Sequence, residues 1–564
     1  MTARMPEYDY VVAGGGSAGC TLAARLSEDP SIRVLLVEAG GNGRSLFTRM
    51  PAGNGILIGN KKYDWGLKSV AQEKMQGRTI YLPRGLGLGG SSLLNGMIYI
   101  RGNPADYDRW ADNGLKGWSY AEVLPYFKRS AGAPHRPGDA YHSVDGAMKL
   151  SPSANLNRLS KAFMKACQEA GSPLSTDFNG ASQLGVGHID TKVFEGIRQS
   201  AAEAYLSRVP DNLTIVTHTR VLAIEFEGPR AVGLKLSTGR VRAAREVHLC
   251  LGAYHSPQVL MLSGIGPADH LASHGIPVRM DLAGVGTRMY DHPNVPLQYD
   301  ILDKSLSMAR HQRFDRAARL VWQYLSSRSG PGSGPFWSVV LFHALRNADH
   351  PELEVFFTPM VVREEGAGGG WNLQTLMRPG RSIIARGKMA RPGFQFDVNL
   401  LRPRSHGTVR LSSSDPMKMP AVDPGYFTHD EDIRDLAAGV RYMREVVAQP
   451  AFQGIVGEEL SPGRSAGTQA GIENAVRALA TTGHHPVSTC PMGGDNEPLA
   501  VLDDALRVRG VEGLRVIDGS SLPGQVSGNV NAPIIMLAEK AADMVLGRPP
   551  LPPENPGRPR ELKR

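Results

Sequence analysis

Cysteine is too scarce in this chain to build a disulfide framework, because only four occur among 564 residues and no two form a Cys-x-x-Cys pair. Scattered thiols in a long chain are typical of a reducing compartment. The residues up to Glu7 also contain no apolar run like that of a signal peptide. We therefore expect a cytoplasmic protein.

Long hydrophobic runs and metal-ligand spacings are missing as well. No stretch approaches the ~18 apolar residues of a membrane span, and the dispersed histidines predict no metal site. The net charge is +9 and the pI is about 9.3, yet the chain contains no nucleic-acid-binding module. We interpret the charge as a basic surface and tail, and expect no nucleic-acid partner.

The most informative pattern present is a dinucleotide fingerprint near the N-terminus. An apolar run over residues 8–13 leads into Gly14, Gly16 and Gly19, and a second run over 34–37 ends on Glu38. This order predicts a strand, a helix over residues 18–26 and a second strand, with a pyrophosphate at the start of the helix. An acid about 20 residues downstream can bind ribose hydroxyls.

The rest of the chain divides by composition. Residues 83–96 are rich in glycine and serine, and residues 213–251 alternate between strands and turns. Aromatic and β-branched runs within 295–480 predict a second, largely antiparallel sheet. Pro533 opens a predicted helix that Gly547 closes, and the proline-rich residues 548–564 predict a disordered tail.

Several segments together resemble the glucose-methanol-choline (GMC) family of FAD-dependent oxidoreductases. The fingerprint resembles its ADP-binding motif, while residues 83–96 and 252–267 resemble its two signatures. Residues 284–293 resemble a further loop of the family, and residues 485–493 and 516–533 resemble its active-site ending. Within the family, the pattern is closer to bacterial choline and alcohol dehydrogenases than to fungal sugar oxidases.

The resemblance implies an α/β fold, α+β overall. A Rossmann-like FAD-binding domain would accompany a substrate-binding domain built on a largely antiparallel sheet. The expected FAD-binding parts are residues 1–155, 206–300 and 481–547, the last with the catalytic histidine and asparagine. Residues 156–205 and 301–480 would form the substrate domain, and 548–564 the tail.

The resemblance also implies which residues hold FAD. Some members tether FAD through a histidine in the first signature, where this chain has Leu94, so we expect non-covalent FAD. The implied cofactor-binding residues are Gly14, Gly16, Ser17, Ala18, Gly19, Glu38, Arg84, Gly89, Gly90, Ser91, Asn95, Gly96, Met97, Val221, Gly252, Asp518, Asn531, Ala532 and Pro533.

For catalysis, the resemblance assigns His485 as the base and Asn529 as its partner. Histidine suits proton transfer because its ordinary pKa lies near physiological pH, and the Asn529 amide can hold the substrate oxygen. We expect His292, His255 and His406 to be structural or on the surface. The substrate pocket is expected to include His484, Trp337, Phe357 and Trp371.

The implied reaction is the oxidation of a primary or secondary alcohol to its carbonyl, with electrons passed to a quinone or another carrier. Gly483 stands where some family oxidases carry a larger apolar side chain, which favours a dehydrogenase. An oxidase that uses O2 is the alternative. A hydroxynitrile lyase or a fatty-acid photodecarboxylase on the same fold is a further one. Aliphatic, aryl, polyol, sugar and choline-like alcohols all stay open as substrates, as does the oligomeric state.

Residues 310–325 predict an amphipathic helix in which Phe314, Ala317, Ala318, Val321, Trp322 and Leu325 share a face beside four arginines. An ordinary lid helix with a solvated face is the simpler interpretation. The alternative is a helix that lies on an anionic membrane, peripheral to the inner membrane, and delivers electrons to a quinone.

Overall fold

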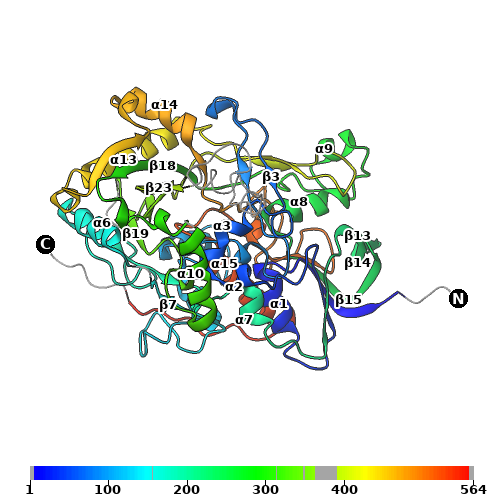
Figure 1. The fold of residues 1–564 in the computed structure, drawn as a ribbon. Helices are drawn as coiled ribbons and strands as arrows, with labels where there is room; N and C mark the ends of the chain where they lie inside the picture. The colour runs from blue at the N-terminus through cyan, green and yellow to red at the C-terminus, as the bar shows by residue number, and fades with distance from the viewer. Residues whose placement is uncertain (1–4, 155, 313, 347–349, 363–389, 558–564) are drawn as a thin grey trace.

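The computed structural model describes residues 5–154, 156–312, 314–346, 350–362 and 390–557. Two sheets of seven strands each organise these residues. Each sheet has its own buried cluster of apolar side chains. Figure 1 shows the first sheet with the blue and red helices, and the second sheet with the yellow helices.

The first sheet has the order β12 (Leu213–Val216), β2 (Val34–Val37), β1 (Glu7–Ala13), β15 (Gly239–Leu249), β14 (Arg230–Leu236) and β13 (Val221–Glu227). The short strand β28 (Leu514–Val516) also pairs with β15. β12, β2, β1, β15 and β28 run parallel, and β14 and β13 run antiparallel. All four residues of β2 are buried, as expected for an inner parallel strand that is covered on both faces.

Helix α1 (Ser17–Leu26) packs on this sheet, α15 (Asn531–Leu546) packs on α1, and α5 (Tyr120–Ser130) packs on α15. The buried carboxylate of Glu539 on α15 ties them together, because it accepts hydrogen bonds from Arg25 on α1 and Arg129 on α5. α15 ends at Gly547, whose φ of 64° is the left-handed geometry of a helix end. Pro533 is the third residue of α15, not the first as the sequence predicted.

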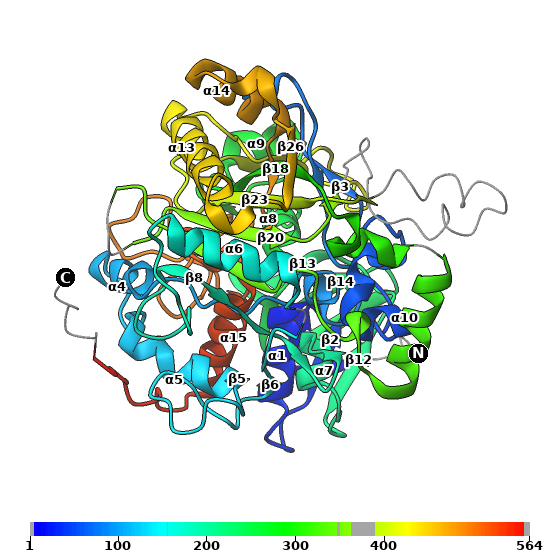
Figure 2. The ribbon, with the colours of Figure 1, turned by 60° about the vertical axis from the view of Figure 1, so that its left-hand side comes forward.

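The second sheet is antiparallel throughout. Its order is β26 (Val456–Ser461), β18 (Pro293–Ile301), β23 (Phe394–Leu400), β20 (Leu353–Thr358), β19 (Val339–His343) and β8 (Gly185–His188), and β27 (Thr481–Thr482) pairs with β18. Helices α6 (Arg158–Glu169) and α13 (Asp430–Val447) cover one face, and α14 (Gln469–Leu479) packs on α13, as Figure 2 shows.

Helix α8 (Gly252–Leu262) lies within the segment that resembles the second signature. Two boundaries differ from the sequence-based expectations. β18 belongs to the second sheet, although the proposed cofactor domain extends to residue 300. Residues 548–557 of the expected disordered tail lie along α5, where the Glu554 N–H donates to the Ala121 carbonyl and Leu551 N–H to the Tyr126 hydroxyl. These contacts hold an extended proline-rich strand in place.

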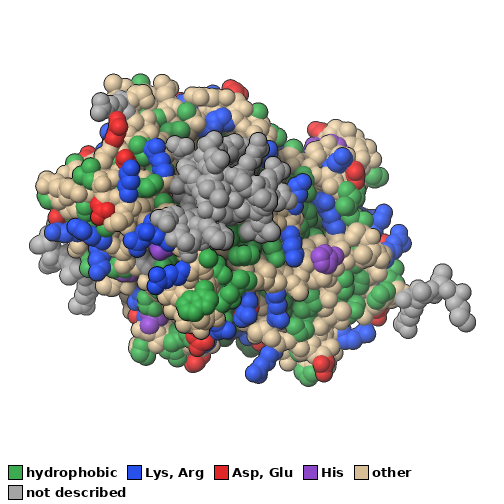
Figure 3. Space-filling view, in the orientation of Figure 1, with side chains coloured by type: hydrophobic (Ala, Val, Ile, Leu, Met, Phe, Trp, Pro, Cys, Tyr) green, Lys and Arg blue, Asp and Glu red, His purple; other side chains and the backbone are tan. Residues whose placement is uncertain are grey.

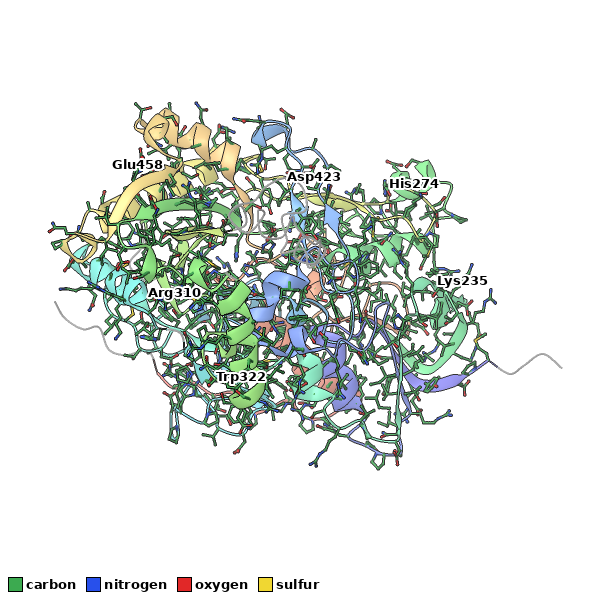
Figure 4. All side chains as sticks on the ribbon, in the orientation of Figure 1. Lys235, His274, Arg310, Trp322, Asp423 and Glu458 are labelled. Atoms are coloured by element: carbon green, nitrogen blue, oxygen red, sulfur yellow. The ribbon has the colours of Figure 1, made fainter. Side chains whose placement is uncertain are left out.

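Helix α10 (Phe314–Ser327) is rotated relative to the face that the sequence predicts. Trp322 is 69% exposed and Leu325 is 62% exposed, whereas Tyr324 is buried. Leu320 and Tyr324 instead lie over Gly332, close to Met50. Figure 3 shows hydrophobic side chains beside Lys and Arg over this helix, and Figure 4 labels Trp322 on it.

Among the described residues, no helix combines the length and the apolar character that crossing a membrane requires.

Candidate active site

A cavity of about 870 Å³ lies between the two sheets. One end is lined by the fingerprint, the first signature and the start of α15. The other end is lined by side chains of β18, β20 and β23. The cavity therefore joins the expected cofactor domain to the expected substrate domain.

The fingerprint glycines are packed as the motif requires. Gly14 has a φ of +99°, and a Cβ at Gly19 would lie 1.8 Å from the Gly14 carbonyl oxygen. No larger residue fits at either position without moving the strand or the helix. A Cβ at Gly90 of the first signature would lie 2.7 Å from Gly16 Cα, so the two glycine-rich segments touch each other beside the cavity.

Most of the predicted cofactor residues line the cavity: Gly14, Gly16, Ser17, Ala18, Glu38, Arg84, Gly90, Ser91, Asn95, Gly96, Met97, Val221, Gly252, Asp518 and Asn531. The other four, Gly19, Gly89, Ala532 and Pro533, lie behind this surface. Gly89 donates its N–H to the Gly15 carbonyl, so its place in the site is to hold the fingerprint loop.

Two predicted acids are engaged with the backbone. Glu38 accepts N–H hydrogen bonds from Gly15 at 2.8 Å, Gly40 at 2.7 Å and Gly87 at 3.1 Å, and thereby binds three loops together. Asp518 accepts from Gly252 N–H at 2.8 Å and from Ser520 N–H at 2.8 Å. Glu38 was predicted from its spacing to bind ribose, but the spacing gave no indication of this bracing contact.

This end of the cavity fits a dinucleotide. The N-terminus of α1 faces it, where free N–H groups and the helix dipole favour phosphate. A Cβ at Gly16 would meet only one atom within 4 Å, at 3.8 Å, so the backbone is open to a ligand there. Leu94 lines the same cavity and offers no nucleophile for a covalent tether.

His485 and Asn529 meet at the centre of the cavity. His485 Nε2 lies 3.0 Å from Asn529 Nδ2, and the Asn529 Oδ1 is buried without a hydrogen-bond partner among the described residues. Burial holds the pKa of His485 well below its usual range, and the nearby charges of His292, His484, Arg84 and Lys192 act in the same direction. The imidazole is therefore neutral at physiological pH.

Two residues that the sequence analysis did not assign to the site hold His485 in place. Asp291 Oδ1 accepts the backbone N–H groups of His485 at 2.7 Å and of His292 at 2.9 Å. Its Oδ2 accepts the hydroxyls of Tyr426 at 2.6 Å and Thr482. His292 Nδ1 lies 2.9 Å from His485 Nδ1. His292 was expected to be structural or on the surface, and the contact brings together residues 193 positions apart, which no local pattern reveals.

Of the residues predicted to line the substrate pocket, Trp337 and His484 do so and Phe357 does not. Trp337 also packs against Gly96 of the first signature. His484 has a φ of 68°, so its backbone is left-handed. Phe357 is fully buried and stacks on Phe163, 5.0 Å between ring centroids.

Phe357 was therefore the wrong residue of its strand, because successive side chains of β20 point to opposite faces. Its neighbour Phe356 lines the cavity instead. Trp371 lies outside the described residues. Polar side chains that the sequence analysis did not single out also face this end of the cavity: Asn294, Thr358, Gln395, Asp397 and Asn399.

The side chains of Asp139, His142 and Asp177 place ligand-type atoms within 4.8 Å of one another in the described part of the chain. His142 Nε2 lies 2.8 Å from Asp177 Oδ2, which explains the grouping as a hydrogen bond. None of the three lines the cavity, and we assign them no metal.

The comparisons with known proteins cover nearly the whole chain. Two family models described as GMC oxidoreductase match residues 8–294 and 403–538. Oxygen-dependent choline dehydrogenase 1 of Chromohalobacter salexigens is 40% identical over 559 residues, 97% of this chain and 96% of the relative. The mitochondrial choline dehydrogenase of Homo sapiens is 39% identical over 562 residues, 97% of this chain and 91% of the relative.

Solved structures agree with this assignment. Pyridoxine 4-oxidase from Mesorbium loti has a TM-score of 0.82 at 29% identity, covering 96% of this chain and 99% of that one. Formate oxidase from Aspergillus oryzae has a TM-score of 0.86 at 27% identity, covering 96% and 98%. The fold, the fingerprint cavity and these matches agree, and this chain belongs to the GMC oxidoreductase family, whose members bind FAD.

Proposed function

We propose that this protein oxidises a primary or secondary alcohol to its carbonyl, with His485 as the base that takes the hydroxyl proton. One observation carries the proposal. The neutral His485 and the Asn529 amide meet, 3.0 Å apart, in the same cavity that the dinucleotide fingerprint lines. The named relatives act on alcohols such as choline, which supports the reaction class.

FAD, held by the fingerprint, the first signature and the start of α15, supplies the acceptor for the substrate's hydride. The chain's own residues must remove the proton and hold the oxygen. His485 Nε2 carries the lone pair that takes the proton. The Asn529 amide, 3.0 Å from it, can turn to donate to the substrate oxygen as its negative charge grows.

The partners of His485 fix which ring nitrogen acts. With the Asn529 amide donating to Nε2, the hydrogen of the neutral ring resides on Nδ1 and points at His292 Nδ1. Asp291 meanwhile holds the backbone of both histidines, and Gln525 donates to the His485 carbonyl at 3.0 Å. A base with a fixed tautomer and a fixed orientation needs little rearrangement when the alcohol binds.

We further propose non-covalent FAD and a dehydrogenase that passes electrons to a quinone or another carrier. Leu94 supports the first part because it cannot form a bond to the cofactor. Gly483 supports the second: a Cβ there would lie 2.9 Å from Asn399 Oδ1 and from the His292 carbonyl. The larger apolar side chain of some family oxidases does not fit beside His485 without displacing these groups.

An anaerobic flavin spectrum tests the reaction. The purified holoenzyme is mixed with aliphatic, aryl, polyol, sugar and choline-like alcohols and then exposed to air. Bleaching by one class supports alcohol oxidation and names the substrate class. Slow recovery in air supports a dehydrogenase, and fast recovery an oxidase. A flavin that stays oxidised with every alcohol contradicts the proposal and favours a lyase or a photodecarboxylase.

The variant His485→Ala tests the base. It should retain FAD but reduce the flavin ~100-fold or more slowly, since a positioned base contributes 10²–10⁴. The rate is measured by anaerobic stopped-flow at saturating substrate. A rate equal to that of the parent enzyme would remove His485 from the proposed role.

A further inference from the structure

A buried lysine faces the cavity and has no part in the proton transfer described above. Lys192 lies between β9 (Asp190–Thr191) and β10 (Val193–Phe194) and is 1% exposed. Its backbone N–H donates to the Met97 carbonyl at 2.7 Å, and its Nζ donates to Asn531 Oδ1. The first signature therefore holds the backbone of Lys192, and the start of α15 holds its ammonium group. Both segments line the cavity.

Lys192 has no carboxylate partner among the described residues. Among the described residues, the charged neighbour that lowers its pKa is another buried cation, Arg198, and burial together with Arg198 lowers the pKa of Lys192 to about 7. A buried cation without a counter-ion is costly. A negative charge that enters the cavity beside Lys192 would supply the missing counter-ion and lower this cost.

Two features locate where that charge belongs. Lys192 Nζ donates to Asn531, two residues after Asn529, and all three residues line the cavity, so Lys192 lies at its catalytic end. Its charge also contributes to the low pKa of His485. The N-terminus of α15, a helix of 16 residues, opens at Asn531, and its positive end adds to the same field. Lys192 is connected to the phosphate-binding end at α1 through Asn531, whose Nδ2 donates a hydrogen bond to Ser17 Oγ at 2.8 Å.

We infer that Lys192 stabilises the negative charge of the reduced flavin at its pyrimidine ring, an inference that rests on the proposed function. In the reaction, the hydroxyl proton goes to His485 and the hydride goes to flavin N5. One negative charge then spreads over N1 and the C2 carbonyl of the flavin. Lys192 forms and breaks no bond, and its ammonium makes this charged state more favourable.

Inorganic sulfite is the probe for this inference. Its lone pair forms a bond to flavin N5 and leaves the same negative charge on N1, without any alcohol or base. In the holoenzyme at pH 6, where Lys192 is protonated, Lys192→Met should bind sulfite about tenfold more weakly or worse. Its midpoint reduction potential should also fall. Lys192→Arg, which keeps the charge, should retain most of the parent's affinity.

Three results would overturn the inference. One is unchanged sulfite affinity and potential in Lys192→Met. Another is weaker FAD binding with both properties unchanged, which would place the lysine at the diphosphate. The third is a loss of sulfite affinity in Lys192→Arg as large as the loss in Lys192→Met. Where Lys192→Met does not fold, Lys192→Gln, which keeps a donor toward Asn531, replaces it. Because sulfite needs no base, loss of the proposed alcohol oxidation would leave this test intact.

Discussion

At the scale of single residues, His292 is a positioning residue for the proposed base. His292→Ala should slow flavin reduction ~10-fold or more, since the His485 ring loses the partner that fixes its tautomer. His292→Asn, whose amide can stand near the place of Nδ1, should retain more activity. Anaerobic stopped-flow across pH 5–9 measures both variants. A purely structural role would instead lower FAD content or thermal stability and leave the rate of the folded fraction unchanged.

The control for this series is His274→Ala, a histidine that follows helix α9 (Ala268–Ser273) and does not line the cavity. Its reduction rate should match that of the parent enzyme.

Glu354 is a second residue with a testable consequence. It is fully buried in β20, and neither carboxyl oxygen has a hydrogen-bond partner among the described residues. Burial raises its pKa to about 8. The folded protein therefore keeps a proton that the unfolded chain loses above pH 4.5, so this residue costs stability as pH rises from about 4.5 to 8.

Glu354→Gln should remove that dependence. The stability difference between variant and parent should grow in favour of the variant by about 3 kcal/mol from pH 5 to pH 8. Chemical denaturation at both pH values measures it. A difference that is constant with pH would mean that Glu354 ionises in the folded state.

At the scale of elements, α10 shows which face of an amphipathic helix packs inward. Tyr324 is buried and Trp322 is 69% exposed. Tyr324→Ala should cost ~3 kcal/mol of unfolding free energy, whereas Trp322→Ala should stay within ~0.5 kcal/mol. Thermal or denaturant unfolding measures both. A larger loss of stability in Trp322→Ala than in Tyr324→Ala would mean that the face predicted from the sequence packs inward.

Sequence pattern predicted elements well where one period dominated. The strand over 34–37 and the helix after the fingerprint were found because continuous apolar runs and glycine spacing define them. The predicted inward face of α10 was wrong because apolar residues occur all around this helix. Leu320 and Tyr324 pack inward because Gly332 has no side chain and leaves room for them. Phe357 was misplaced because adjacent phenylalanines in a strand cannot be told apart until the sheet's two faces are known.

The same reasoning explains the candidate site. His485 and Asn529 came from a motif, and the structure brings them together. Asp291, His292 and Lys192 were not assigned to it because their chemistry depends on tertiary contacts: Asp291 and His292 meet a segment almost 200 residues later in the chain, and Lys192 meets one 339 residues away.

At the scale of the whole molecule, the cavity sits where the two sheets meet, so FAD should hold both together. Removing it should lower the unfolding midpoint of the entire chain, because a ligand present at 100 times its Kd adds ~2.7 kcal/mol to stability. Differential scanning calorimetry of holo- and apoprotein measures this. Readdition of FAD should restore the midpoint, and a midpoint indifferent to FAD would mean that FAD does not bind the folded chain in preference to the unfolded one.

The pairing of β28 with β15, and of α15 with α1, has a consequence for biosynthesis. Residues 514–546 supply a strand of the first sheet, a helix against the first helix, and Asn529. A chain emerging from the ribosome N-terminus first therefore cannot finish its first domain until residues 514–546 have been made. Until then the apolar faces that await α15 stay open to solvent. This chain should thus depend on chaperones until α15 has been made, and a stop codon just before α15 should be as damaging as an early one.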